Sequence, residues 1–356
     1  MAESPPAELH QVESPDVVTA QRDIVVVGAS AGGVETLAEL VSGLPEEFPA
    51  AIFVVLHLLP TAHSVLPEIL DRSGTLPAAA AVDDEDIDRG RIYVAPPDRH
   101  LLLGPGRVSL TRGPRENGHR PAVDPLFRSA ARAYRQRVIA VVLSGSLDDG
   151  TAGLRLVKRM GGTTVAQDPD DALYPSMPAS AVANDGADYV VPVADLPALL
   201  CDLVDTQIEM DPGTPFDPAD LDAVRADRSD PEDPRDGDLT GLTCPECGGS
   251  LWEHLSTDGY VRFKCHVGHA YSPDSLETAQ SDGLEMALWS ALRTLQERGD
   301  LFRRLARRSG RSARHRFEAK AAEVDHHADL LRQSIERLGR LPAADEVAPA
   351  VELEGG

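Results

Sequence analysis

The segment GASAGG, at residues 28–33, carries a serine between glycines, directly after an apolar run and before a helical pattern. In a G-x-S-x-G turn the chain bends sharply from strand to helix and presents the serine hydroxyl, while small neighbours let a substrate carbonyl approach. The first N–H groups of the helix can stabilise an oxyanion that develops there. The segment therefore predicts a nucleophile at Ser30.

A dinucleotide-binding turn is the competing interpretation of these glycines. Its fingerprint, G-x-G-x-x-G, requires glycine where this chain has Ser30, and an acidic residue suited to a ribose at the end of the second strand. The second apolar run ends in His57 instead. A nucleotide-dependent oxidoreductase is therefore the weaker hypothesis, and we expect catalysis to need no cofactor.

Two further residues could form a proton relay with Ser30. His57 ends the apolar run IFVVLH, and Asp149 follows the run VIAVVLSG. In a doubly wound sheet, functional side chains gather at the carboxyl ends of the strands, where all three residues would lie. A serine needs a base, and an imidazole needs an acid that fixes its tautomer. The residues alone leave Asp148 open as the acid and His100 open as the base.

The elements that would position these residues follow an α/β pattern. From Asp23 to about Val204, short apolar runs alternate with helical patterns, which is typical of βαβ units. The runs are apolar throughout, as strands covered on both faces require. We therefore expect an α/β fold with a doubly wound, mostly parallel sheet and a hairpin excursion near residues 91–111. The chain order serine, histidine, acid differs from that of the α/β-hydrolases and argues against that fold.

Several ordered segments of residues 23–204 resemble the catalytic domain of the CheB-type chemotaxis receptor methylesterases. They are VVVGASAGG, FVVLHLLP, YVAPPDRHLLL, VDPLFRSAARAY, VVLSGSLDDGTAGL, GGTTVAQDP and YPSMPASA. The resemblance implies that Ser30 is the nucleophile, His57 the general base and Asp149 the orienting acid. It favours Asp149 over Asp148, because the acid of the family directly precedes a glycine.

The reaction that the resemblance implies is hydrolysis of glutamate γ-methyl esters on chemoreceptor-like signalling proteins, with deamidation of glutamine as a further activity. Ser30 would attack the ester carbonyl to form an acyl-enzyme, His57 would protonate the departing methanol, and water would complete the turnover. Members of the family commonly carry an N-terminal receiver domain. Only 22 residues precede the first expected strand here, so we expect a receiver-less member without control by aspartyl phosphorylation in cis.

Three of the four cysteines lie within residues 244–265 and suggest a metal site. Cys244 and Cys247 share a CPECGG turn, and Cys265 begins the segment CHVGH. A TDG turn between two strand-like runs predicts a β-hairpin that joins the two ligand pairs. Such paired turns are typical of a zinc ribbon, so we expect a structural zinc ion bound by Cys244, Cys247, Cys265 and His269.

Two alternatives to this ligand set stay open. His266 competes as the fourth ligand, although adjacent Cys and His rarely bind one metal comfortably. A redox pair of Cys244 and Cys247 would need a thioredoxin-like strand before it, which the sequence lacks. The module and the helices after it also resemble C-terminal extensions of some receiver-less members of the esterase family, a likeness that implies no activity.

The acidic composition limits the classes of partner. Asp and Glu outnumber Lys and Arg by 58 to 34 and give a net charge of −24, which argues against binding to nucleic acid or to an anionic membrane. No apolar run approaches the roughly 20 residues of a membrane span, and the N-terminus lacks the features of a signal peptide. We expect a cytoplasmic protein, because a reducing compartment favours metal binding by a cysteine cluster.

Length and local composition divide the chain further. A length of 356 residues predicts about two domains. The stretch before the cysteines holds twelve acidic residues, three arginines and five prolines, which is typical of an extended linker. A 4-3 apolar spacing near the C-terminus predicts a helical hairpin that packs on itself, on a second copy or on a partner. The expected segments are a disordered N-terminus at 1–22, a catalytic domain at 23–204, an acidic linker at 205–239, a zinc-ribbon-like module at 240–272, a helical hairpin at 273–341 and a disordered tail at 342–356.

The alternative to a methylesterase is a catalytically idle adaptor, which would bind a receptor or regulator and recruit partners through its zinc-binding and helical tail. The presence of Ser30, His57 and Asp149 together favours the enzyme. Because the metal ligands lie across a flexible linker, we expect metal removal to unfold residues 240–272 without affecting ester hydrolysis.

Overall fold

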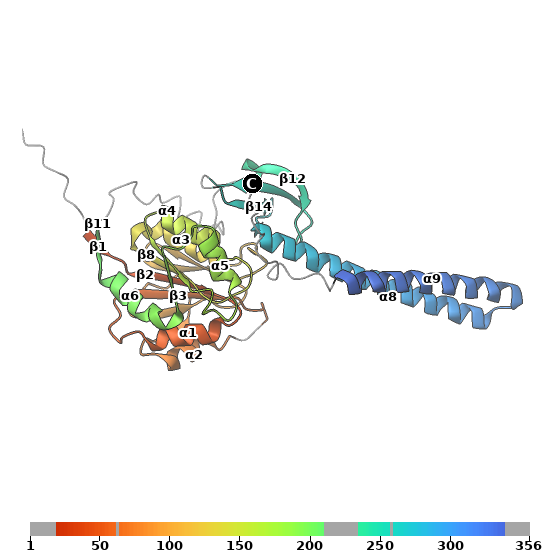
Figure 1. The fold of residues 1–356 in the computed structure, drawn as a ribbon, viewed down its shortest axis with the longest axis horizontal. Coiled ribbons are helices and arrows are strands. Elements are labelled where there is room, and N and C mark those ends of the chain that lie inside the picture. Colours follow the sequence, from red (N-terminus) through yellow and green to blue (C-terminus); the bar gives the residue numbers. More distant parts are fainter. Residues whose placement is uncertain (1–18, 62–63, 210–233, 257–258, 339–356) are drawn as a thin grey trace, which may run out of the picture.

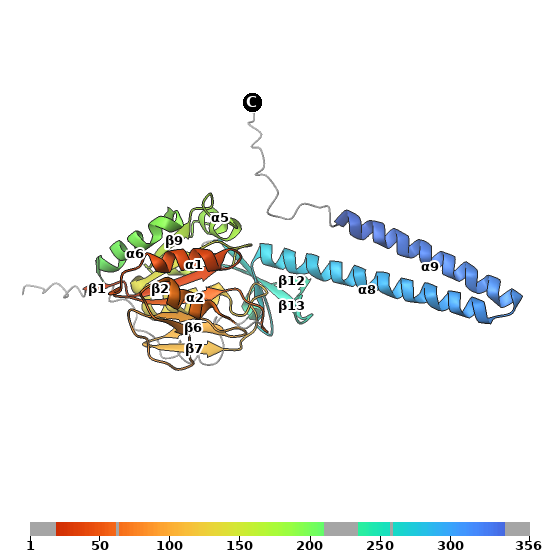
Figure 2. The same cartoon turned by 90° about the horizontal axis from the view of Figure 1, so that it is seen from below.

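The computed structural model describes residues 19–61, 64–209, 234–256 and 259–338. They form an α/β body, a small antiparallel sheet beside it, and two long helices that project away from both (Figures 1 and 2). The remainder of the chain, including the tail expected at 342–356, lies outside the described residues.

A seven-stranded sheet forms the centre of the α/β body. Its order is β10-β9-β8-β2-β3-β5-β4, and every neighbouring pair is parallel. This confirms the predicted parallel sheet. The strands are β2 (Ile24–Ala29), β3 (Ala51–Leu56), β4 (Ala78–Ala80), β5 (Ile92–Val94), β8 (Val138–Val142), β9 (Thr163–Gln167) and β10 (Tyr189–Val191).

Helices cover both faces of this sheet, with α1, α2 and α6 on one face and α3, α4 and α5 on the other (Figure 1). Alternate residues of β2 reach the two cores, since Val25 and Val27 pack with the first group and Val26 with the second. Burial on both faces explains why the strands are apolar throughout. The helices are α1 (Gly33–Ser42), α2 (Leu66–Ser73), α3 (Val123–Tyr134), α4 (Thr151–Arg159), α5 (Ser176–Ala183) and α6 (Leu196–Asp205), with short 3₁₀ turns η1 (Arg135–Arg137) and η2 (Val193–Asp195).

The expected hairpin excursion is present as a separate two-stranded sheet of β6 (His100–Gly104) and β7 (Arg107–Thr111). It is fastened to α3 by hydrogen bonds from the Leu103 N–H to Ser129 Oγ, from the Gly106 N–H to the Tyr134 hydroxyl, and from that hydroxyl to the Gly104 carbonyl. The connection from β7 to α3, residues 112–122, is called the β7–α3 loop below. It leads from the hairpin to the edge of the sheet where the predicted triad lies.

The boundaries of the N-terminal segment and of the linker differ from the prediction. Thr19–Gln21 forms strand β1 and Gln207–Glu209 forms strand β11, and the two pair in antiparallel fashion. Both fall in stretches for which the sequence predicts no regular structure. Arg22 donates to the Leu203 carbonyl, so the chain ahead of β2 runs beside the end of α6. The two strands pair through hydrogen bonds between backbone N–H and C=O groups, which do not depend on the side chains. The amino-acid composition therefore does not reveal this pairing.

A second, antiparallel sheet follows in the order β12-β13-β14-β15. With its connections it is called the Cys/His module, residues 238–272, and it begins two residues before the expected boundary. Its small core contains Leu251, Tyr271 and the buried Cys244 and Cys265, and Leu276 of the helix that follows packs against them. The short 3₁₀ turn η3 (Pro234–Asp236) precedes the module, whose strands are β12 (Asp238–Thr243), β13 (Ser250–Leu255), β14 (Val261–Cys265) and β15 (Ala270–Tyr271).

Two long helices, α8 (Pro273–Arg308) and α9 (Arg311–Leu338), run back along each other (Figure 2). Their contact buries Leu292 of α8 against Ala328 and Ile335 of α9. Much of the predicted apolar seam therefore packs within one chain, whereas Leu284, nearer the start of α8, stays exposed. Among the described residues, no helix combines the length and the apolarity that a bilayer crossing requires.

Gly28, on β2, allows α3 to approach the sheet closely. A Cβ atom at this position would lie 2.3 Å from Val123 Cγ1. We expect Gly28→Ala to displace the start of α3 and to lower the free energy of unfolding by about 1–3 kcal/mol, the usual cost of overpacking. Chemical denaturation followed by circular dichroism measures this change.

Gly283→Ala is the matched control for that substitution. Gly283 lies on α8 with no atom within 4 Å of an added Cβ, and alanine is the better helix former. This variant should unfold at the same or a higher denaturant concentration than the parent. An equal loss of stability in both variants would contradict the importance of the close approach at Gly28.

Candidate active site and metal centre

Ser30, His57 and Asp149 follow three neighbouring strands of the parallel sheet. These strands, β2, β3 and β8, lie in the order β8-β2-β3, and their parallel register aligns their carboxyl ends. The structure therefore brings the three predicted residues together at one edge of the sheet, which is the edge where ligands of such folds usually bind.

The three side chains form a continuous series of hydrogen bonds. Ser30 Oγ lies 3.0 Å from His57 Nδ1, and His57 Nε2 lies 2.7 Å from Asp149 Oδ2. The His57 and Asp149 side chains are 5% and 2% exposed, so their contact is shielded from water. Because an ionised carboxylate only accepts, Nε2 carries the imidazole proton, and Nδ1 is left to accept the hydroxyl proton of Ser30.

Four donors converge on the Asp149 carboxylate. Besides His57, they are the Val123 N–H at 2.7 Å, the Asp124 N–H at 3.2 Å and the side-chain amide of Asn117 at 2.9 Å. Val123 and Asp124 begin α3, so the positive end of that helix faces the carboxylate. Burial alone would raise the pKa of Asp149, but the hydrogen bond and electrostatic attraction of His57, together with the Val123 N–H, hold this pKa well below its usual range.

Asp148 points away from this series and toward the C-terminal part of the chain. Its carboxylate accepts hydrogen bonds from the Ser272 hydroxyl at 2.5 Å and from the Tyr260 hydroxyl at 3.3 Å. Burial, reinforced by neighbouring carboxylates, raises the pKa of Asp148 to about 7. The geometry thus separates the two acids that spacing alone could not distinguish.

Two other histidines lie near this edge. His100 is buried, donates from Nε2 to the Pro114 carbonyl at 2.9 Å and accepts the Ala122 N–H at Nδ1, so it holds the β7–α3 loop and is not available as a base. His119, which sequence reasoning missed, stacks on His57 with ring centroids 3.7 Å apart and an interplanar angle of 6°. Burial and the neighbouring His57 lower the pKa of His119 to about 4, so its ring is neutral at pH 7.

Glycines close to Ser30 shape the turn that carries it. Gly32 has a φ of 70°, in the left-handed region, and lets the chain turn directly into α1. A Cβ at Gly145 would lie 2.8 Å from Ser30 Cβ and 2.1 Å from Met177 Sδ, so glycine is required there. The Ser30 N–H donates to the Ser144 carbonyl at 3.0 Å and ties the turn to the segment after β8. Ser30 itself remains partly exposed at the rim.

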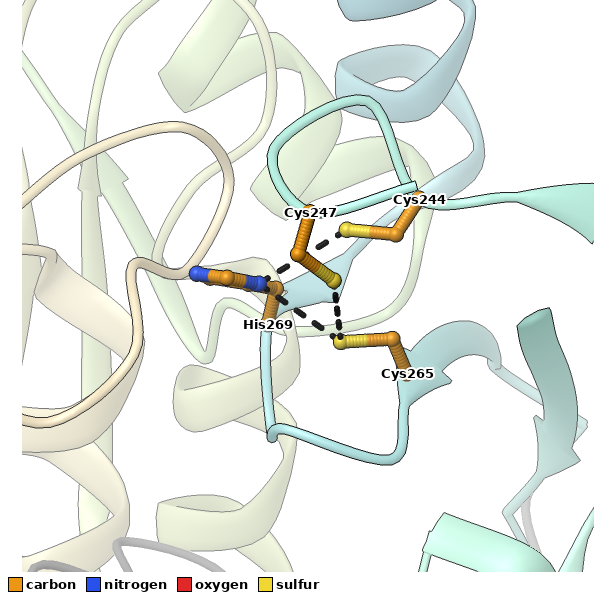
Figure 3. Close-up of side chains that lie close together, drawn as sticks. All are labelled: Cys244, Cys247, Cys265 and His269. Atoms are coloured by element: carbon orange, nitrogen blue, oxygen red, sulfur yellow. Dashed lines mark hydrogen bonds between the residues drawn. The ribbon is translucent and has the colours of Figure 1, made fainter. Parts of the chain in front are cut away.

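The four predicted metal ligands gather in the Cys/His module (Figure 3). Cys247 Sγ lies 3.7 Å from Cys265 Sγ, and His269 Nδ1 lies 3.7 Å from Cys244 Sγ and 3.5 Å from Cys265 Sγ. In a tetrahedral zinc site with Zn–S bonds of about 2.3 Å, neighbouring ligand atoms lie about 3.5–3.8 Å apart. These three distances match those values, and all four ligand atoms lie within 4.8 Å of one another, so the donor set fits a zinc ion. His266, the competing ligand, is exposed and lies outside the cluster.

The Cys/His module packs directly against the α/β body, which corrects the expectation that a flexible linker keeps them separate. Its Ala270 carbonyl accepts the Asn117 N–H at 2.8 Å, and its Arg262 pairs with the buried Glu116 at 2.8 Å. Both contacts involve the β7–α3 loop, which borders the Ser30 site. The structural reason for expecting metal removal to spare hydrolysis is therefore wrong.

Asp148 makes the stability of the protein depend on pH. Its pKa is about 7 in the folded state, against 3.8 for an unperturbed aspartate, so the folded state binds an extra proton between these values. This contribution favours folding at low pH and is lost as the pH rises through about 7. We expect Asp148→Asn, an isosteric replacement without charge, to weaken the fall in denaturation midpoint between pH 5 and pH 8. An unchanged pH dependence in this variant would rule out Asp148 as its source.

Comparison with known proteins agrees with the geometry. The model of the CheB methylesterase family matches residues 25–200. A protein-glutamate methylesterase/protein-glutamine glutaminase of Methanosarcina mazei is 36% identical over 183 residues, which cover 49% of this chain and 50% of the relative. A putative protein-glutamate methylesterase/protein-glutamine glutaminase of Leptospira interrogans is 34% identical over 188 residues, which cover 52% of this chain and 97% of the relative.

A solved structure is also similar. The crystal structure of the Thermotoga maritima CheB methylesterase catalytic domain shares 38% sequence identity with this chain at a TM-score of 0.50, and the match covers 52% of this chain and 100% of that one. The chain spans about half the length of several curated relatives that it matches, and nearly all of the one from Leptospira interrogans. The parallel sheet and these matches agree with each other. The chain belongs to the CheB methylesterase family.

Proposed function

We propose that this chain hydrolyses glutamate γ-methyl esters on chemoreceptor-like signalling proteins, and that deamidation of glutamine is a second reaction of the same site. The observation that carries the proposal is the hydrogen-bond series of 3.0 Å from Ser30 to His57 and 2.7 Å from His57 to Asp149. The names of the relatives, protein-glutamate methylesterase/protein-glutamine glutaminase, support the class of substrate.

In the first half of the reaction, Ser30 Oγ attacks the ester carbonyl carbon while His57 Nδ1 takes the hydroxyl proton. The backbone N–H of the residue after Ser30, in the turn between β2 and α1, would stabilise the oxyanion of the tetrahedral intermediate. When the bond to the methoxy oxygen breaks, His57 returns the proton to that oxygen and methanol leaves. The ionised Asp149 stabilises the imidazolium and holds its tautomer, which is the role that its lowered pKa suits.

In the second half, water attacks the acyl-enzyme and gives a proton to His57. The Ser30 oxygen then leaves with that proton, and the product is a free glutamate side chain. One water molecule is consumed and one methanol is released per turnover. With a glutamine substrate, ammonia leaves in place of methanol and the other steps are the same.

We infer that the Cys/His module binds one zinc ion through Cys244, Cys247, Cys265 and His269, in a zinc-ribbon-like site. Four protein ligands leave no open coordination position, so the ion would stabilise the fold and take no part in the hydrolysis. A cytoplasmic location fits these free thiols, because a reducing compartment keeps them available as ligands.

Ser30→Ala tests the nucleophile. We expect methanol release from membranes that carry methylated chemoreceptors to fall by about 10⁴-fold or more, because the group that forms the acyl-enzyme is missing. Ser42→Ala, an exposed serine at the end of α1, is the matched control and should retain the parental rate. Release by the Ser30 variant at the parental rate would contradict the proposal. A parent that binds receptors without releasing methanol would support the idle adaptor instead.

The metal assignment predicts one zinc ion per chain in the purified protein, measured by elemental analysis. Cys247→Ser should lose the metal, because a hydroxyl is a poor zinc ligand. Cys201→Ser is the matched control, since Cys201 lies on α6 outside the ligand cluster, and it should retain the full zinc content. Equal zinc content in both variants would contradict the ligand set.

A further inference from the structure

The β7–α3 loop lies between the triad and the C-terminal part of the chain. The Asn117 N–H donates to the Ala270 carbonyl at 2.8 Å, and the Ala270 N–H donates to the Arg115 carbonyl at 3.3 Å. The loop thus extends the small antiparallel sheet by one short segment beside β15. Its backbone position is therefore set by the Cys/His module as well as by the α/β body.

The side chain of Asn117 links the two parts at the triad itself. Its Oδ1 accepts hydrogen bonds from the Ser272 N–H and from the Ser275 hydroxyl, both at 2.9 Å. Its Nδ2 donates to Asp149 Oδ1 at 2.9 Å and to Asp124 Oδ2 at 3.3 Å. A backbone N–H can only donate, so Oδ1 must face Ser272 and the amide donors must face the carboxylates. Asn117 therefore binds Oδ1 of Asp149, whereas His57 binds Oδ2 of the same carboxylate.

The residue before Asn117 fastens the loop from a second direction. Glu116 accepts from Arg128 of α3 at 2.6 and 2.8 Å and from Arg262 of β14 at 2.8 Å. Burial alone would raise the pKa of Glu116, but the two guanidinium charges outweigh it and hold this pKa at about 2. Separating the module from the body would take Arg262 away from this buried carboxylate and so break a charge-assisted hydrogen bond in a water-poor site, which is costly. The loop is therefore clamped in one position while the module is folded.

The metal ligands determine where the clamping segment of the module lies. His269 directly precedes β15, and its carbonyl accepts the Cys265 N–H at 3.0 Å. The hydroxyl of Tyr271, on β15, lies 3.7 Å from Cys244 Sγ. A metal ion that joins the CPECGG turn to the CHVGH turn thus also fixes the strand that contacts the β7–α3 loop.

We propose that Asn117 is a positioning residue for Asp149 and that the metal-bound Cys/His module holds Asn117 in place. The folded module would then keep the active site in its catalytic arrangement. Hydrolysis would depend on the metal, although the metal takes no part in the chemistry. This inference rests on the hydrolase function proposed above.

Asn117→Gly and Asn117→Ala test the positioning role in the full chain. Asn117 has a φ of 51°, which glycine adopts without strain and alanine does not, so the glycine variant removes the amide but keeps the backbone. We expect both variants to lower kcat by about 10- to 100-fold, the usual effect of losing such a supporting hydrogen bond, with little change in KM. The NMR signal of the imidazole proton shared by His57 and Asp149 should shift in both.

The matched control is Asn184→Gly, at the end of α5 and away from the triad, which should keep the parental kcat and the parental imidazole signal. Parental kcat and signal in Asn117→Gly, with a loss confined to Asn117→Ala, would overturn the positioning role, because only the backbone conformation would then matter.

Metal removal from the full chain tests the second part of the proposal, with amide hydrogen exchange as a readout independent of activity. A chelator should speed exchange at residues 115–119 while the strands of the parallel sheet stay protected, and kcat should fall together with this protection. Added zinc should restore both. Protection of residues 115–119 and kcat that survive metal removal would overturn the coupling.

Two further comparisons distinguish a failure of the metal coupling from a failure of the proposed hydrolase function. Cys201→Ser should show the parental exchange pattern before and after chelation, because this thiol lies outside the metal set. If the parent releases no methanol from any methylated substrate, the proposed hydrolase function fails. The exchange measurement then still decides whether the metal holds the β7–α3 loop.

Discussion

The buried negative charge of Asp149 is the constraint around which this end of the molecule is arranged. A carboxylate removed from water needs several donors, and here they come from elements that are distant in sequence. The end of β3 supplies His57, the start of α3 supplies two N–H groups, and the β7–α3 loop supplies Asn117. The start of α3 can reach the carboxylate only because Gly28 and Gly150 leave room for Val123.

Two adjacent aspartates show how strongly such surroundings decide chemistry. Asp149 meets four donors and keeps its charge, whereas Asp148 meets two hydroxyl groups near other carboxylates and has a pKa of about 7. The sequence presents them as equivalent neighbours. Backbone direction alone sends one toward His57 and the other toward Ser272, and the different partners then set opposite pKa shifts.

The sequence predicts both the parallel sheet and the proximity of Ser30, His57 and Asp149, for a simple physical reason. Strands buried on both faces must be apolar throughout, so they are visible as short uninterrupted runs. Parallel strands present their carboxyl ends at one edge, so any polar residue directly after such a run is a candidate. The cysteine spacing carries comparable information, because a tetrahedral metal site demands closely spaced pairs of ligands.

Residues in the β7–α3 loop could not be found in this way. Asn117 and His119 lie in a segment without periodicity, where an Asn-Gly pair signals only a turn. The docking of the Cys/His module escaped prediction for a related reason. An acidic, proline-rich connection indicates separation, whereas the contact depends on single buried partners such as Glu116, which no local pattern reveals.

Ser272 connects the long helix α8 to the α/β body. It is the N-cap of α8, and the same residue binds Asn117 and Asp148. A helix of 36 residues is a stiff rod about 54 Å long, and α9 braces much of it. The start of this helix is thus tied through Ser272 to the two residues that flank Asp149, namely Asn117 in space and Asp148 in sequence. A partner that binds the far ends of α8 and α9 would therefore also orient the edge of the sheet where Ser30 lies.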